Sequence, residues 1–175
     1  MLSRRSVLPL LVGLLALAGS LPARAASAPI TVEGTLEGPV RGSAPTTVTL
    51  NVPDDGRRAL RKFPDGTSVR LSMEGVKAPG GASLRVFVNL PAAGATTPTS
   101  DPHYVGAMTS FEDPAADSPG DDFLLDATPV LKKLEKSGRL LPGDTLAVTF
   151  VLAPGSAKED VAIPIQRVVL SIARP

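Results

Sequence analysis

The sequence has 175 residues, of which 43% are hydrophobic, and its formal net charge is +1. This length suffices for one domain with its own core, and the absence of cysteine excludes disulfides and thiolate sites. With a single histidine, the chain alone cannot form a metal or catalytic site that needs several imidazoles.

The N-terminus has the order of an export signal. Arg4-Arg5 precede an apolar run over Val7–Ala18, and small-residue sites follow at Ala23–Ala25 and Ala26–Ala28. The stretch Ser3–Leu8 also resembles a twin-arginine signal, although arginine pairs occur in ordinary secretory signals too.

We therefore expect residues 1–28 to be a signal peptide and residues 29–175 to form one domain. We expect this domain to be exported by a bacterium and to be periplasmic or extracellular. The apolar run is too short for a comfortable membrane span, and we expect no stable membrane span after the signal is cleaved. Cleavage after Ala25 removes three of the 18 basic residues and leaves 15 against 17 acids, a net charge of −2. That charge argues against nucleic acid as a partner.

The first third of the domain contains two predicted strands and a basic patch. Ile30–Leu36 and Thr46–Val52 are β-branched runs typical of strands, and Pro53–Gly56 has the composition of a turn. The basic patch comes next, and it is either a solvated loop or a docking surface for an acidic partner. Its members are Arg57, Arg58, Arg61 and Lys62.

Two alternating runs form the centre of the predicted scaffold. Ser68–Val76 and Leu84–Leu90 each place apolar residues at every second position, as a strand with one buried face requires. The Gly-rich stretch Ala78–Ala82 joins them. The pattern predicts a hairpin with a medium-length loop.

The next part of the chain alternates between loops and short strands. Pro91–Pro102 has no apolar period and predicts a long exposed loop. Tyr104–Phe111 predicts a strand in which Gly106 marks a bulge or a close backbone approach. Glu112–Asp122 is an acidic loop, and Phe123–Asp126 predicts another strand.

One helix is expected, starting at Thr128-Pro129 and ending before Gly138. Thr128 and Asp126 are rival caps, and the apolar stripe consists of Val130, Leu131 and Leu134.

Two strands close the domain. Thr145–Leu152 alternates cleanly, whereas Val161–Ile172 changes parity near Gln166, which predicts a bulge. Together these segments predict a mainly β fold, which would be an antiparallel β-sandwich or open barrel of about eight strands with one short α-helix.

The order of these segments resembles the C-terminal domain of plant-type polyphenol oxidases and tyrosinases, which is named for its Lys-Phe-Asp-Val motif. Leu71–Val76 resembles a strand ending in Glu-Gly-Val, and Ser83–Asn89 resembles the motif strand itself. Tyr104–Met108 resembles the aromatic-Gly strand that follows a variable loop. Ser83 and Arg85 depart from the motif, which has Lys and Asp there.

In that family the domain shields a copper site held by histidines of a separate oxidase domain. With one histidine this chain cannot be the oxidase. The resemblance therefore implies a stand-alone, non-catalytic, exported accessory protein. Its partner would be a tyrosinase-like copper oxidase. Its role would be to shield the active site of the oxidase, to help the oxidase fold, to load its copper or to be exported together with it. The alternative is an independent periplasmic or cell-surface binding module for carbohydrate or protein.

The candidate partner-binding residues are His103 and Tyr104 beside the long loop, together with Arg57, Arg58 and Arg61 of the basic patch. Tyr104 would offer a substrate-like phenol and His103 a transient copper contact, although Tyr104 also suits a core position. Met73 and Met108 are weaker copper candidates, since methionine on an apolar strand face is usually core. The acidic loop lacks the spacing of a calcium site. No catalytic set, resident cofactor or metal is assigned.

Overall fold

The computed structural model describes residues 27–42, 44–115, 117–140, 144–156 and 161–175. Nearly all of the expected signal peptide lies outside the described residues, as do parts of the turns expected at 140–143 and 154–160. The described residues form ten strands in three antiparallel sheets and two helices.

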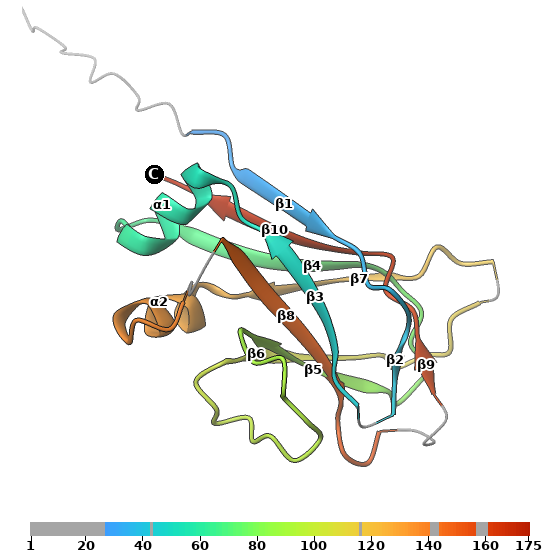
Figure 1. Cartoon of the computed structure of the whole chain (residues 1–175). Helices are drawn as coiled ribbons and strands as arrows, with labels where there is room; N and C mark the ends of the chain where they lie inside the picture. Colours follow the sequence, from blue (N-terminus) through green and yellow to red (C-terminus); the bar gives the residue numbers. More distant parts are fainter. Residues whose placement is uncertain (1–26, 43, 116, 141–143, 157–160) are drawn as a thin grey trace, which may run out of the picture.

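Two four-stranded sheets pack face to face as a sandwich (Figure 1). In spatial order, the first contains β1 (Ile30–Gly34), β10 (Arg167–Ala173), β4 (Ser68–Val76) and β7 (Asp121–Asp126). The second contains β3 (Thr46–Asn51), β8 (Thr145–Leu152), β5 (Ser83–Val88) and β6 (Tyr104–Thr109). A small third sheet pairs β2 (Val40–Arg41) with β9 (Ala162–Ile163). The predicted antiparallel sandwich is confirmed, and the two-residue strands account for the count above eight.

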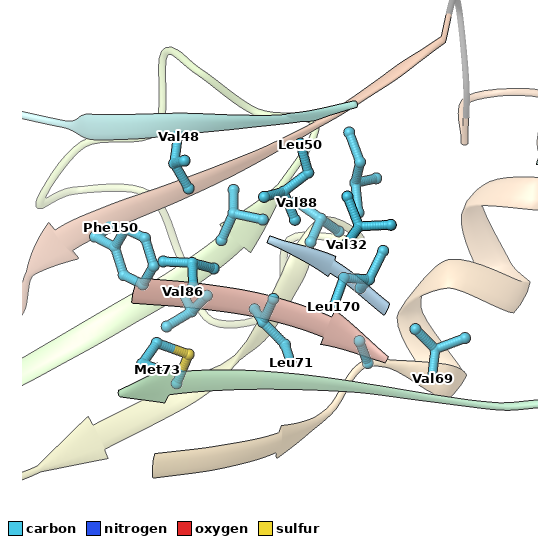
Figure 2. Close-up of a cluster of buried hydrophobic side chains, with 14 of the residues drawn as sticks. Val32, Val48, Leu50, Val69, Leu71, Met73, Val86, Val88, Phe150 and Leu170 are labelled. Carbon is cyan, nitrogen blue, oxygen red and sulfur yellow. The ribbon is translucent and has the colours of Figure 1, made fainter. Parts of the chain in front are cut away.

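The core lies between the two large sheets, where alternating apolar rows face each other (Figure 2). The first sheet contributes Leu71 and Met73 of β4, and the second contributes Val86 of β5 and Phe150 of β8, all with no exposed surface. Full burial of such side chains stabilises the fold by roughly 1.5–3 kcal/mol each.

The predicted central hairpin is wrong. β4 pairs with β10 and β7, whereas β5 pairs with β8 and β6 in the other sheet. The stretch Ala78–Ala82 therefore crosses from one layer to the other. The two apolar rows were read correctly, but they meet across the core instead of lying side by side, because each needs an apolar face opposite it.

The basic patch forms part of a second helix, α1 (Asp54–Lys62), where the sequence predicted a turn and a loop. Acids in its first turn and bases in its last turn complement the helix dipole. Gly56, which suggested a turn, is buried where the helix approaches the sheet, since an added Cβ would lie 2.9 Å from Val52 Cγ1 and 3.3 Å from Ile172 Cδ1 of β10. The helix ends at Phe63, whose φ is 37° and whose N–H donates to the Ala59 carbonyl at 2.8 Å.

The expected helix is confirmed as α2 (Thr128–Lys136), with Leu131 and Leu134 buried. Asp126 accepts a hydrogen bond from the Thr128 N–H at 2.9 Å. The Thr128 hydroxyl also accepts a hydrogen bond from the Val69 N–H in β4 at 2.9 Å. The N-cap position is Ala127, so neither of the two expected caps occupies it. Asp126 accepts from the first N–H of the helix, and Thr128 ties the helix to the sheet.

The bulge expected near Gln166 is also wrong. The segment is split into β9 and β10, which belong to different sheets, so the parity change marks a passage between layers. A one-residue bulge does occur in β6. Gly106 pairs with Val86 and Tyr104 with Phe87, which leaves Val105 as the extra residue.

Candidate partner-binding surfaces

His103 lies directly before β6 and is half-buried. Its Nδ1 lies 2.8 Å from the Val88 carbonyl oxygen at the end of β5, and its backbone N–H donates to Asp101 Oδ1 at 2.8 Å. A carbonyl can only accept, so the proton is on Nδ1 and the lone pair of the neutral ring is on Nε2. Metal-binding histidines commonly donate their other ring N–H to a backbone carbonyl in this way.

Tyr104 belongs to a second, smaller apolar cluster on the outer face of the β5–β8 sheet. Its ring centroid lies 5.4 Å from that of Phe87, with the rings inclined at 57°. The buried Ala93 of the long loop and Val151 of β8 complete the cluster core. The Tyr104 side chain is thus half-buried: it packs against this cluster and keeps part of its surface exposed to solvent.

The predicted long loop, Pro91–Pro102, has no helix or strand, as expected, but it is packed onto the protein. Arg85 Nη1 donates to the carbonyls of Ala95 at 3.3 Å and Thr97 at 3.1 Å. Arg85 is one of the two residues that depart from the family motif, and its hydrogen bonds to the loop give a structural reason for an arginine at this position. The loop that covers Tyr104 is therefore held by a side chain from the neighbouring strand.

The two methionine candidates lie in the core, Met73 with no exposed surface and Met108 with 5%. A copper contact through either would require the side chain to leave the core. Within the described ranges no group of three or more histidine or acidic residues could hold a metal ion. His103 is the candidate whose position permits a contact with a partner's metal.

The arginines of α1 differ in how much of their charge is available. Arg57 forms ion pairs with Asp54 and with Asp144, which precedes β8. Arg58 pairs with Asp55, and this hydrogen bond and charge lower the pKa of the Asp55 carboxyl. Arg61 and Lys62 are exposed and make no ion pair among the described residues. Of the three candidate arginines, Arg61 is therefore the one best placed to meet an acidic partner.

The sequence interpretation missed the role of Asn89, which follows β5 with a φ of 52°. Its Oδ1 accepts from the Ala147 N–H at 3.1 Å, and its Nδ2 donates to the Leu140 carbonyl beyond α2. These bonds join the ends of β5, β8 and α2, so His103, which bonds Val88, lies at the end of the sandwich that carries the helices. In the sequence, the signal for this role of Asn89 is its position at the end of the motif strand Ser83–Asn89.

No protein-family model matches the sequence, and no curated protein sequence is similar to it. Solved structures of latent aurone synthase, a polyphenol oxidase, do match. The recombinantly expressed form is 19% identical over 77% of this chain and 25% of its own, with a TM-score of 0.53. The form from the natural source is 21% identical over 78% of this chain and 26% of its own, with a TM-score of 0.50. Latent apple tyrosinase is 16% identical, with a TM-score of 0.43, over 84% of this chain and 26% of its own.

The chain thus spans about a quarter of the length of the polyphenol oxidases that it matches. The likeness establishes a shared fold and confirms the resemblance to polyphenol oxidases at that level. In the part of the chain that the structure covers, no helix is long and apolar enough to cross a membrane.

Proposed function

We propose that this chain is an exported, non-catalytic accessory protein that binds a tyrosinase-like copper oxidase. The observation that carries the proposal is the fold shared with a quarter of a latent polyphenol oxidase. The single histidine of the sequence supports it, because a copper site held by several imidazoles must then come from the partner. Shielding, folding, copper loading and co-export are the roles open to such a protein.

The oxidase would dock on the end of the sandwich that carries α1 and α2 (Figure 1). His103 supports this placement, since its Nδ1 is engaged by Val88 and its Nε2 is the ring nitrogen with a lone pair for a partner's copper. Arg61 adds an uncompensated positive charge for acidic groups of the oxidase. Tyr104 would contribute through the shape of the packed loop more than through a free phenol, because its ring rests on Phe87.

The test is co-expression with a tagged bacterial tyrosinase-like oxidase that has no shielding domain of its own. We expect the two chains to co-purify and the bound oxidase to differ from the free oxidase in copper content or in phenol oxidation. An oxidase that elutes alone at micromolar concentrations of both chains, with unchanged copper content and activity, would contradict the proposal.

Substitutions locate the surface. We expect His103→Ala and Arg61→Ala each to weaken complex formation or its effect on the oxidase. Arg41→Ala is the matched control, because Arg41 is an exposed arginine in β2, at the other end of the sandwich (Figure 1). Equal loss in all three variants would show that docking does not use the helix-bearing end. Tyr104→Phe, which keeps the ring packing, should leave binding intact.

A further inference from the structure

Phe111 is the most exposed large apolar side chain among the described residues, with 89% of its surface accessible. It lies two residues after the end of β6, where the chain leaves for β7 at the end of the sandwich opposite to the helices (Figure 1). The strand expected over Tyr104–Phe111 ends two residues earlier, so Phe111 has no place in the core. Covering this ring with the apolar surface of a partner would be favourable, because it removes apolar area from water.

The backbone on both sides of Phe111 is held in place. Ser110 is buried, donates its N–H to the Ala82 carbonyl at 3.0 Å and accepts from the Gly81 N–H at 2.8 Å. Asp113 Oδ1 accepts from the Gly80 N–H at 2.8 Å. The aromatic ring is therefore presented from a fixed backbone, which lowers the entropy cost of docking it against a partner.

Phe111 borders an open cleft of about 490 Å³ between the end of β6 and the start of β7. Phe123 lines the same cleft, as do the carboxylates of Glu112, Asp121 and Asp122. Among the residues that the structure describes, no basic side chain lines it. Asp122 Oδ1 accepts from the Gly75 N–H at 3.0 Å, whereas the side chains of Glu112 and Asp121 have no hydrogen bond or ion pair among the described residues.

We propose that this cleft binds a basic segment of a protein partner, with an apolar side chain of the segment covering Phe111 and its lysine or arginine side chains meeting the carboxylates. Charge complementarity selects a cation, and the aromatic rings add cation–π attraction. A metal ion or a small amine would leave Phe111 exposed, whereas a peptide segment covers it. The proposal goes beyond the accessory function and does not depend on which protein supplies the segment.

The experiment titrates the mature protein with a blocked peptide, Gly-Arg-Leu-Arg-Gly, and with the matched acidic peptide Gly-Glu-Leu-Glu-Gly, and follows backbone amide NMR shifts. We expect the basic peptide alone to shift the amides of residues 109–113 and 121–123. Binding should weaken as salt rises from about 50 to about 300 mM, because the screening length of exposed charges falls from more than about 10 Å to less than about 8 Å over this range. Because no oxidase is present, this proposal and the accessory proposal fail separately.

Two variants and two controls test the residues. We expect Phe111→Ala and the pair Glu112→Gln with Asp121→Asn each to raise the Kd on the order of tenfold, a loss of about 1.4 kcal/mol. Leu124→Ala removes an exposed apolar side chain of β7 that does not line the cleft, and Asp117→Asn removes a charge outside it. Both controls should stay within about twofold of the wild type.

Several results would overturn the proposal. Equal binding of the acidic peptide would remove the charge argument, and full affinity in Phe111→Ala would remove the aromatic anchor. Shifts from Ca²⁺ alone that compete with the peptide and persist in Phe111→Ala would make the cleft a cation site instead. Concentration-dependent dimerisation that Phe111→Ala abolishes would assign the surface to a second copy of the chain.

Discussion

Asn89→Gly tests the junction that holds the helix-bearing end together. Glycine tolerates the φ of 52° at this position, so the substitution removes the side chain without straining the backbone. Two side-chain hydrogen bonds disappear, from Ala147 to Oδ1 and from Nδ2 to Leu140. The contact to the Arg139 carbonyl, at 3.5 Å, is too long to add much.

The expected cost follows from these two bonds. Each contributes about 0.5–1.5 kcal/mol net, so the free energy of unfolding should fall by about 1–3 kcal/mol. For a domain of this size that corresponds to a decrease in Tm of roughly 2–4 °C per kcal/mol. Glycine also gains entropy in the unfolded chain, which costs about 0.4–1 kcal/mol at any position. Thr99→Gly in the exposed loop measures this general effect, because the Thr99 side chain makes no hydrogen bond in the described structure.

Urea unfolding of the mature protein, followed by far-UV circular dichroism, measures the difference; fluorescence is poorly suited because the chain has no tryptophan. Hydrogen exchange of the Ala147 amide gives a local readout, since that N–H donates to Asn89 Oδ1. We expect it to exchange faster in Asn89→Gly than in Thr99→Gly. If the two variants agree within about 0.5 kcal/mol and Ala147 exchanges at the same rate in both, the side chain of Asn89 does not hold this junction.

Three further substitutions test other contacts. Arg85→Met removes the charged donor that holds the long loop, worth about 1.5–3 kcal/mol, so cleavage within residues 91–102 by a nonspecific protease should accelerate on the order of tenfold; an unchanged rate would show that Arg85 does not hold the loop. Gly75→Ala places a Cβ against the Gln166 side chain at a φ of +63°, and the urea midpoint should correspond to a loss of about 1–3 kcal/mol, with partial recovery on adding Gln166→Ala if the clash is the cause. The Thr128 hydroxyl and N–H lower the pKa of Asp126, so the carboxylate stabilises the fold above its ordinary pKa of about 3.9. The urea midpoint of Asp126→Asn should therefore lie below wild type at pH 7 and approach it as the pH falls from that ordinary value toward more acid conditions, and a constant difference would refute the linkage.

The candidate site was predictable only in part. His103 stood out as the single histidine, and its bond to Val88 then identified which ring nitrogen is free. The basic patch was visible as residue types, but its charge balance was not, because Asp144 reaches Arg57 from 87 positions along the chain. Phe111 read as a strand residue, since nothing in its local pattern shows that β6 ends at Thr109.

The sequence by itself determined the long strands with a clean alternation, because a period of two depends only on neighbouring residues, and it predicts β4, β5 and β8 close to their observed bounds. It also determined α2, from Pro129 and the following apolar stripe. Only the tertiary structure decided which strands pair, because an apolar row is satisfied equally by a neighbour in its own sheet or by one across the core. For the same reason α1 could not be foreseen, since the buried Gly56 makes sense only against the sheet that it touches.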